Sequence, residues 1–123
     1  MTTKKRLLIV DDASVIRRIL KKILGDTYEF VEAADGDEAL SVLGGDAPFD
    51  LMICDYYLPG RNGLQVIEAK QRLEHRMALP VIMITSSRSG EAIARGKTLG
   101  VRDWINKPFV AETVVAAVAA CFA

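Results

Sequence analysis

Three short, uninterrupted apolar runs recur along the chain, at residues 7–10, 51–54 and 81–84. Continuous rather than alternating apolar residues are typical of parallel strands that are covered on both faces. Two further segments, 28–33 and 101–105, carry charged residues among apolar ones, which an edge strand tolerates. The sequence therefore predicts five strands, with the uninterrupted runs at the centre of one sheet and the two charged segments at its edges.

Helical patterns lie between the strands. The clearest has apolar residues at 15, 16, 19, 20, 23 and 24 on one face, and Gly25 is expected to end it. Weaker patterns cover 36–43, 63–73, 90–99 and 109–122. Alternating strands and helices joined by right-handed crossovers predict an α/β doubly wound, five-stranded parallel sheet with five helices on both faces. In 123 residues without a repeat or linker, residues 4–122 are expected to form a single domain.

The composition restricts the partners of the chain. The 16 lysines and arginines balance 16 acidic residues, so no net charge attracts the protein to nucleic acid or to an anionic membrane. The apolar stretch after the basic start is too short for a signal peptide or a membrane span, which predicts a cytoplasmic protein. Cys54 and Cys121 have neither CxxC spacing nor histidine partners, so they predict neither a metal site nor a disulfide.

Chemistry-bearing residues stand where the predicted strands end: Asp11, Asp12, Asp55, Thr85 and Lys107. In doubly wound sheets, ligands bind beyond the carboxyl ends of the strands. An acidic pair in place of a glycine-rich loop argues against a nucleotide or flavin site, because carboxylates repel phosphate. Together with Asp55 the pair forms an oxygen-ligand set suited to Mg²⁺.

The Asp55 carboxylate, at the end of its predicted strand, can act as a nucleophile toward phosphorus and form an aspartyl phosphate. Mg²⁺ and the Lys107 ammonium would neutralise the phosphoryl oxygens, and the Thr85 hydroxyl with the following backbone N–H would donate hydrogen bonds. Simpler interpretations stay open for each residue alone. The acidic pair can cap the next helix, Thr85 can cap a strand, and Lys107 can be a surface charge.

At this point the sequence resembles the receiver domains of two-component response regulators. The resemblance rests on the acidic pair after the first strand, the run Asp-Tyr-Tyr-Leu-Pro-Gly-Arg-Asn-Gly at 55–63, a threonine closing the fourth strand, and Gly-Val-Arg-Asp-Trp-Ile-Asn-Lys-Pro-Phe at 100–109. It covers almost the whole chain. It implies a flavodoxin/CheY-like fold with strand order 2-1-3-4-5, which agrees with the edge and centre strands predicted above.

The resemblance also implies roles for individual residues. Asp55 would accept a phosphoryl group from a histidine kinase or a histidine phosphotransfer protein, in an Mg²⁺-dependent reaction. Asp12, Asp55 and the main-chain carbonyl of Tyr57 would bind Mg²⁺, and Asp11 would act through water. Lys107 would contact the phosphoryl group, and a cis peptide is implied between Lys107 and Pro108. Such a domain is not an enzyme in the usual sense, because it catalyses only its own phosphorylation and dephosphorylation.

Further implied roles concern signalling. Thr85 and the backbone N–H of Ser86 would bind the phosphoryl group, and Thr85 would let Trp104 turn inward, changing a surface made of the fourth helix, fifth strand and fifth helix. Most relatives have Tyr or Phe at the position of Trp104, and a core role on an edge strand is the alternative. Tyr57 and Ser87 are candidates for setting the hydrolysis rate.

Two surfaces are candidate partner sites. A basic face on the first helix could dock a phosphohistidine-bearing partner or could simply be solvated; it consists of Arg17, Arg18, Lys21 and Lys22. The last helix has only Glu112 and Thr113 as polar residues. Alanine-rich packing explains part of this, and the rest favours either a partner protein or a homodimer through the surface of the fourth helix, fifth strand and fifth helix. Gly96 inside the fourth helix suits either an element that must shift or mere tolerance.

Alternative functions remain open at the level of the sequence. The chain could be the receiver part of a longer DNA-binding or hybrid-kinase regulator. An aspartate-nucleophile phosphatase is less favoured, because such enzymes usually have a second acid two residues after the nucleophile, and that position is Tyr57 here. A pure interaction module would not need the full set of site residues.

Overall fold

A computed structural model describes residues 4–123 and shows one five-stranded sheet in the order β2-β1-β3-β4-β5. All four strand pairs are parallel. The strands are β1 (Lys5–Val10), β2 (Tyr28–Ala33), β3 (Leu51–Cys54), β4 (Val81–Thr85) and β5 (Val101–Asn106). The predicted fold class, strand order, and central and edge strands are confirmed.

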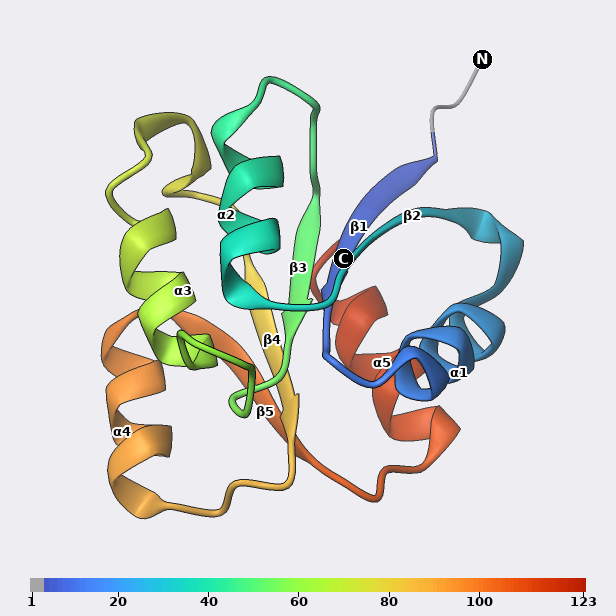
Figure 1. The fold of residues 1–123 in the computed structure, drawn as a ribbon. Coiled ribbons are helices and arrows are strands. Elements are labelled where there is room, and N and C mark those ends of the chain that lie inside the picture. The colour runs from blue at the N-terminus through green and yellow to red at the C-terminus, as the bar shows by residue number, and fades with distance from the viewer. Residues whose placement is uncertain (1–3) are drawn as a thin grey trace.

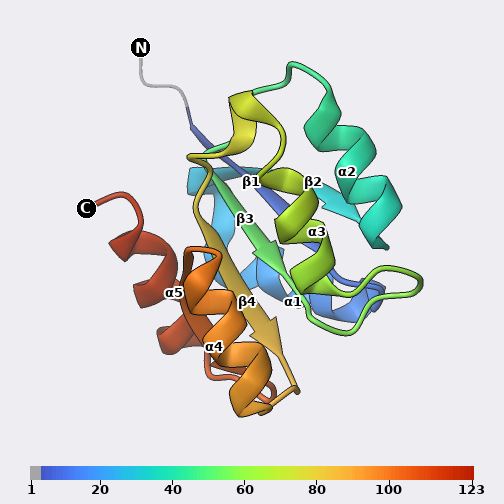
Figure 2. The same cartoon turned by 90° about the vertical axis from the view of Figure 1, so that its left-hand side faces the viewer.

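Five α-helices cover the two faces of the sheet, with α1 and α5 on one side and the other three on the opposite side (Figures 1 and 2). They are α1 (Ser14–Leu24), α2 (Gly36–Gly44), α3 (Gly63–Lys70), α4 (Gly90–Thr98) and α5 (Ala111–Ala120). Two short 3₁₀ turns, η1 (Gly25–Thr27) and η2 (Glu74–Arg76), lie between elements. Within the described residues, none of these helices has the length and apolarity needed to cross a membrane.

The sheet has a core on each face, which explains the uninterrupted apolar runs. Along β1, Leu7 and Ile9 pack into the layer under α1 and α5, whereas Leu8 and Val10 pack into the layer under the other helices. Successive strand residues point to opposite faces, so a strand covered on both sides needs an apolar residue at every position.

Three expectations about the helices need correction. The third helix ends at Lys70 rather than at residue 73, and η2 follows, where the buried Arg76 donates hydrogen bonds to the carbonyls of Leu43, Gly45 and Ala47. The last helix begins at Ala111, after the cis Lys107–Pro108 peptide.

The third correction concerns the apolar face of α1, because Val15 and Ile19 are 58% and 40% exposed. Leu20 and Leu24 cover the sheet instead. Successive helical residues are about 100° apart around the axis, so Val15 and Ile19 form a second stripe beside the buried one. Gly25 ends this helix with a positive φ of 76°, as predicted.

Candidate functional site: an acidic pocket at the strand ends

The predicted site residues converge at the carboxyl ends of the strands, at the lower edge of the sheet in Figure 1. Asp11 follows β1, Asp55 follows β3, Thr85 ends β4 and Lys107 follows β5. Asp11, Asp12 and Asp55 each offer a carboxylate oxygen within 4.8 Å of those of the other two. The structure therefore brings together residues that are far apart in the sequence.

Strand register fixes the two buried carboxylates side by side. Val10 pairs with Cys54 across β1 and β3, and the Asp55 N–H donates to the Val10 carbonyl at 2.9 Å. Each carboxylate is also oriented by the chain that follows it: Asp11 Oδ1 accepts from the Ala13 N–H at 2.9 Å, and Asp55 Oδ1 accepts from the Tyr57 N–H at 3.2 Å.

Lys107 joins the two carboxylates. Its Nζ lies 2.7 Å from Asp11 Oδ2 and 2.8 Å from Asp55 Oδ2, and the peptide that follows it is cis, as predicted. Burial alone would lower the pKa of the ammonium, but the hydrogen bonds to Asp11 and Asp55 outweigh burial and raise the pKa of Lys107. Burial raises the pKa of Asp11 despite the hydrogen bond from Lys107. Three carboxylates and the Lys107 ammonium therefore meet in this pocket.

The donor set fits a hard divalent cation. Asp12 is exposed, whereas Asp11 and Asp55 are 3% and 5% exposed, so an ion among the three oxygens would have protein ligands on one side and water on the other. Mg²⁺ prefers this arrangement of one or two carboxylates with retained waters.

A chain of hydrogen bonds leads from the site to the edge of the sheet. Thr85 is fully buried, and its Oγ1 accepts from the Ser87 N–H at 3.2 Å. The Ser87 carbonyl accepts from Trp104 Nε1 at 3.0 Å. Ser86, which lies between Thr85 and Ser87 in the sequence, is exposed. Threonine and tryptophan on neighbouring strands are therefore linked through one buried residue.

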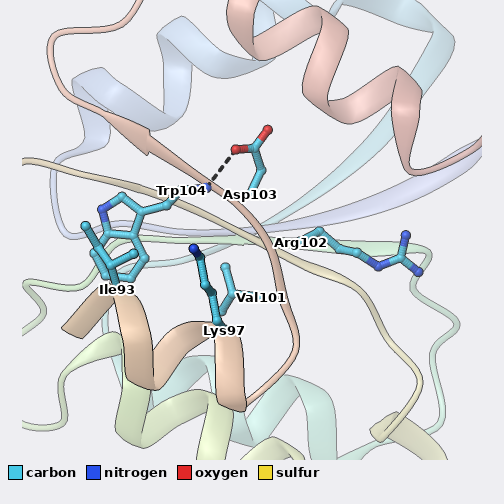
Figure 3. Close-up of a pocket in the computed structure, with 6 residues that line it drawn as sticks. All are labelled: Ile93, Lys97, Val101, Arg102, Asp103 and Trp104. Carbon is cyan, nitrogen blue, oxygen red and sulfur yellow. Dashed lines mark hydrogen bonds between the residues drawn. The ribbon is translucent and has the colours of Figure 1, made fainter. Parts of the chain in front are cut away.

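Trp104 is half-buried on β5 and lies against α4, next to Ile93 and Lys97 in Figure 3. A Cβ at Gly96 would lie 3.3 Å from the indole ring, so the glycine makes room for the bulky side chain. The close-up also shows the Asp103 carboxylate accepting from the Trp104 N–H, at 2.9 Å. Tyr57 is 54% exposed and stacks edge-on against Tyr56.

Two residues of the site escaped sequence reasoning. A Cβ at Gly63 would lie 2.2 Å from the Asp55 carbonyl oxygen, so any larger residue at the start of α3 would have to displace the main chain at Asp55. The position of Gly63 at the end of the 55–63 motif was its only signal. Arg17 was predicted to be part of a basic surface, but its guanidinium is turned inward and contacts the Asp11 carbonyl and Glu32.

Comparison with known proteins assigns the family. The family described as "Response regulator receiver domain" matches residues 7–119. The chain belongs to this family and is a receiver domain of two-component signalling, a phosphorylation-activated switch. Receiver domains bind Mg²⁺ in an acidic pocket and interact with histidine kinases and downstream targets.

Individual relatives agree with this assignment. The chain is 37% identical over 114 residues to the chemotaxis protein CheY of Pseudomonas aeruginosa, covering 89% of each protein. It is 35% identical to the transcriptional regulatory protein ResD of Bacillus subtilis, covering 93% of this chain and 46% of that protein. The solved structure of chemotaxis response regulator CheY4 of Vibrio cholerae superposes with a TM-score of 0.88 at 33% identity, covering 97% of this chain and 99% of that one.

Proposed function

We propose that Asp55 is the phosphoacceptor of this receiver domain. The supporting observation is the convergence of three aspartates and Lys107 at the strand ends. Asp12, Asp55 and the Tyr57 carbonyl would hold Mg²⁺, with Asp11 acting through water. We propose that residues 4–122 form the domain that carries this activity; its five strands belong to one sheet.

In the proposed reaction, an Asp55 oxygen attacks the phosphorus of a phosphohistidine on a histidine kinase or histidine phosphotransfer protein. The P–N bond breaks, its electron pair goes to the imidazole, and the imidazole takes a proton from water. Mg²⁺, when bound, neutralises charge on the phosphoryl oxygens. Lys107, the Thr85 hydroxyl and the Ser86 N–H contact the remaining oxygens. To switch the domain off, water attacks phosphorus, the bond between phosphorus and the Asp55 oxygen breaks, and inorganic phosphate leaves with both protons of the water. The chain thus catalyses only its own phosphorylation and dephosphorylation.

The test uses acetyl phosphate with Mg²⁺ and intact-mass spectrometry. The wild-type chain is expected to gain one phosphoryl group, and Asp55→Asn none. Asp46→Asn, a change of the same kind at an exposed carboxylate outside the pocket, is expected to label normally. Full labelling of Asp55→Asn, or of the wild-type chain without Mg²⁺, would contradict the proposal.

The signal is proposed to pass along the Thr85–Ser87–Trp104 chain. When the Thr85 hydroxyl turns toward a phosphoryl group it gives up the Ser87 N–H, and Ser87 carries the carbonyl that anchors Trp104. Since Trp104 is the only tryptophan, its fluorescence reports this step. Beryllofluoride with Mg²⁺ is expected to change the emission of the wild-type chain and not of Thr85→Ala. Unchanged wild-type emission would count against the switch.

Tyr57 and Ser87 are proposed to tune the rate of dephosphorylation. Tyr57 lies exposed at the mouth of the pocket, whereas Ser87 is buried and bonded to Thr85 through its main chain. Ser87→Ala keeps both main-chain hydrogen bonds, so a changed lifetime of the phosphorylated chain would isolate the hydroxyl. Lifetimes unaltered in both Tyr57→Ala and Ser87→Ala would remove this role.

Phosphodonor docking is proposed on a narrower surface than the sequence predicted. Arg17 and Lys21 are bound to Glu32, at 2.9 and 2.8 Å, which leaves Arg18 and Lys22 as the exposed cations. Arg18 and Lys22 lie beside the exposed Val15 and Ile19, on the helix that follows the exposed Asp12. We call this surface the α1 stripe; it consists of Val15, Arg18, Ile19 and Lys22.

Arg18→Glu is expected to slow phosphotransfer from the cognate kinase while labelling by acetyl phosphate stays unchanged. Lys97→Glu, the same kind of reversal on exposed α4, is the control and is expected to leave kinase transfer intact. An unchanged kinase rate in Arg18→Glu would remove the α1 stripe as a docking surface.

The output surface is proposed to comprise α4, β5 and α5, and to bind either a downstream target or a second copy of the chain. Val115 on α5 and Val110 just before it are 44% and 60% exposed, and the neighbouring β5 presents charges of both signs at Arg102 and Asp103. Such a mixture suits a symmetric, self-complementary interface. Light scattering with and without beryllofluoride tests the homodimer, and a monomer in both states at all concentrations would refute it.

A further inference from the structure

Arg17 occupies an unusual position for a charged residue on a surface helix. Its side chain is 15% exposed, and its guanidinium makes two directional contacts. Nη1 donates to the main-chain carbonyl of Asp11 at 2.5 Å, and Nε donates to Glu32 Oε1 at 2.9 Å. One side chain therefore connects the residue after β1, the first turn of α1 and the edge strand β2.

Glu32 is in turn held on its other side. Lys21 Nζ lies 2.8 Å from Glu32 Oε2, one turn along α1 from Arg17. The hydrogen bonds from Lys21 and Arg17 lower the pKa of Glu32 below its usual value, so the carboxylate stays ionised. Arg17 donates from Nε to this ionised carboxylate and from Nη1 to the Asp11 carbonyl, so Glu32 orients the guanidinium toward Asp11.

The Asp11 carbonyl is the point where this arrangement meets the pocket. The same residue places its carboxylate against Lys107, and the next residue is Asp12, a proposed Mg²⁺ ligand. Three further hydrogen bonds hold the turn: Asp11 Oδ1 accepts from the Ala13 N–H, the Asp11 N–H donates to the Ala33 carbonyl, and the Arg17 N–H donates to the Ala13 carbonyl. Groups outside the ligand sphere that orient metal ligands typically change metal affinity by about 10–100-fold when removed.

We infer that Arg17 is a positioning residue for the Mg²⁺ site. Its guanidinium holds the Asp11–Asp12 turn through the Asp11 carbonyl and is itself held by Glu32. This inference rests on the Mg²⁺ site of the proposed function. It removes Arg17 from the docking surface and gives it a role beside the pocket, through the Asp11 main-chain carbonyl.

Electrostatics gives this inference a sign that distinguishes it from its rival. If Arg17 acted only as a nearby positive charge, its removal would reduce repulsion of Mg²⁺ and strengthen binding. If Arg17 positions the turn, its removal weakens binding although a repulsive charge has been lost. The two accounts therefore predict opposite changes in the dissociation constant.

The experiment is a titration of ¹⁵N-labelled chain with MgCl₂, followed by amide shifts, which also report whether each variant is folded. Arg17→Met keeps the apolar stem and is expected to raise the Mg²⁺ dissociation constant about tenfold, the lower end of the range for outer groups. Lys22→Met, which removes an exposed cation of the same helix without touching Glu32 or Asp11, is the matched control and is expected to stay within about twofold of wild type, below that range. Arg17→Lys keeps the positive charge, but an ammonium cannot reproduce the two hydrogen bonds that the planar guanidinium makes through Nε and Nη1. This variant is therefore expected to bind Mg²⁺ nearly as weakly as Arg17→Met.

Affinity in Arg17→Met equal to or tighter than in wild type would overturn the inference and leave the proposed function standing. Absence of Mg²⁺ binding by the wild-type chain would overturn both. If Arg17→Met does not fold, Glu32→Ala supplies the test, because it releases the anchor while leaving Asp11 and Arg17 in place; unchanged affinity in that variant would refute the inference.

Discussion

The three glycines that begin α2, α3 and α4 provide a sharp test of how tightly the fold encloses the phosphoacceptor. Gly36, Gly63 and Gly90 occupy the same position, each directly after a residue whose side chain caps the helix by accepting from an N–H three residues on. None has a positive φ, so alanine suits the backbone at all three. Only their tertiary surroundings differ.

Those surroundings set the expected order of stability. An added Cβ at Gly90 meets nothing within 4 Å, whereas at Gly36 it lies 2.8 Å from a methyl group of the buried Val66. At Gly63 it lies 2.2 Å from the Asp55 carbonyl oxygen and 3.0 Å from Met83 Cε. Carbon and oxygen in even a weak C–H···O contact stay about 3.3 Å apart, so the main chain at Asp55 must move by about 1 Å.

The free energies follow from two opposing effects. Replacing glycine by alanine at a compatible site stabilises a protein by about 0.4–1 kcal/mol through the unfolded chain. Overpacking costs about 1–3 kcal/mol, and occasionally more. We expect Gly90→Ala to be more stable than wild type, Gly36→Ala to be less stable than Gly90→Ala, and Gly63→Ala to be less stable than wild type by roughly 2 kcal/mol.

Urea unfolding of the four proteins measures this order. With a slope of about 1–3 kcal/mol per molar urea, the midpoint of Gly63→Ala is expected about 1 M below that of wild type. Because the displaced carbonyl belongs to Asp55, Gly63→Ala should also label more slowly with acetyl phosphate while it is folded, and Gly90→Ala should not. Equal midpoints for Gly63→Ala and Gly90→Ala would refute the steric reasoning.

Two further predictions concern the lysines. Lys107→Met leaves two buried carboxylates without their cation and is expected to lose on the order of 3 kcal/mol of stability in Mg²⁺-free buffer. Added Mg²⁺ should raise the urea midpoint of this variant more than that of wild type. An equal rise in both proteins would contradict this prediction. Lys70 is 1% exposed, its ammonium donates to the Met77 carbonyl at 3.3 Å, and burial lowers its pKa below 10.5. As the pH rises toward 10.5, the unfolded chain holds this proton and the folded chain does not, so wild-type stability should rise through that window. Lys70→Met should lack this contribution, which urea midpoints at several pH values below 10.5 would reveal, and parallel curves for the two proteins would refute the assignment.

The sequence was sufficient to predict the sheet because burial on both faces leaves a local mark. Every residue of β3 and β4 is buried, and both appear as continuous apolar runs. Asp11, Asp55 and Thr85 were predictable for the same reason, since each follows directly on such a run. The apolar set of α1 misled the prediction because a helical pattern cannot tell which of two adjacent stripes faces the sheet.

The remaining features depend on contacts between segments that are distant in sequence. The inward turn of Arg17 requires Glu32 on the neighbouring strand, and the sequence alone shows only a basic helix. The glycine at 96 is explained by the Trp104 ring on β5, not by helix propensity. Pairs of this kind are determined by the packing of α1 against β2 and of α4 against β5, which no local pattern encodes.

The acidity of the pocket makes its chemistry conditional on a cation. Three carboxylates face one ammonium, and Lys107 is already shared between Asp11 and Asp55. Two unit charges about 4 Å apart near a protein surface interact by roughly 4 kcal/mol, so an incoming phosphoryl group would meet net repulsion of that order without a divalent ion. With the ion bound, the same carboxylates hold the charge that attracts the anion. The positions of Asp11 and Asp12 therefore control phosphorylation through the cation, which is why a residue such as Arg17, outside the pocket, is expected to change the reaction by way of Mg²⁺ affinity.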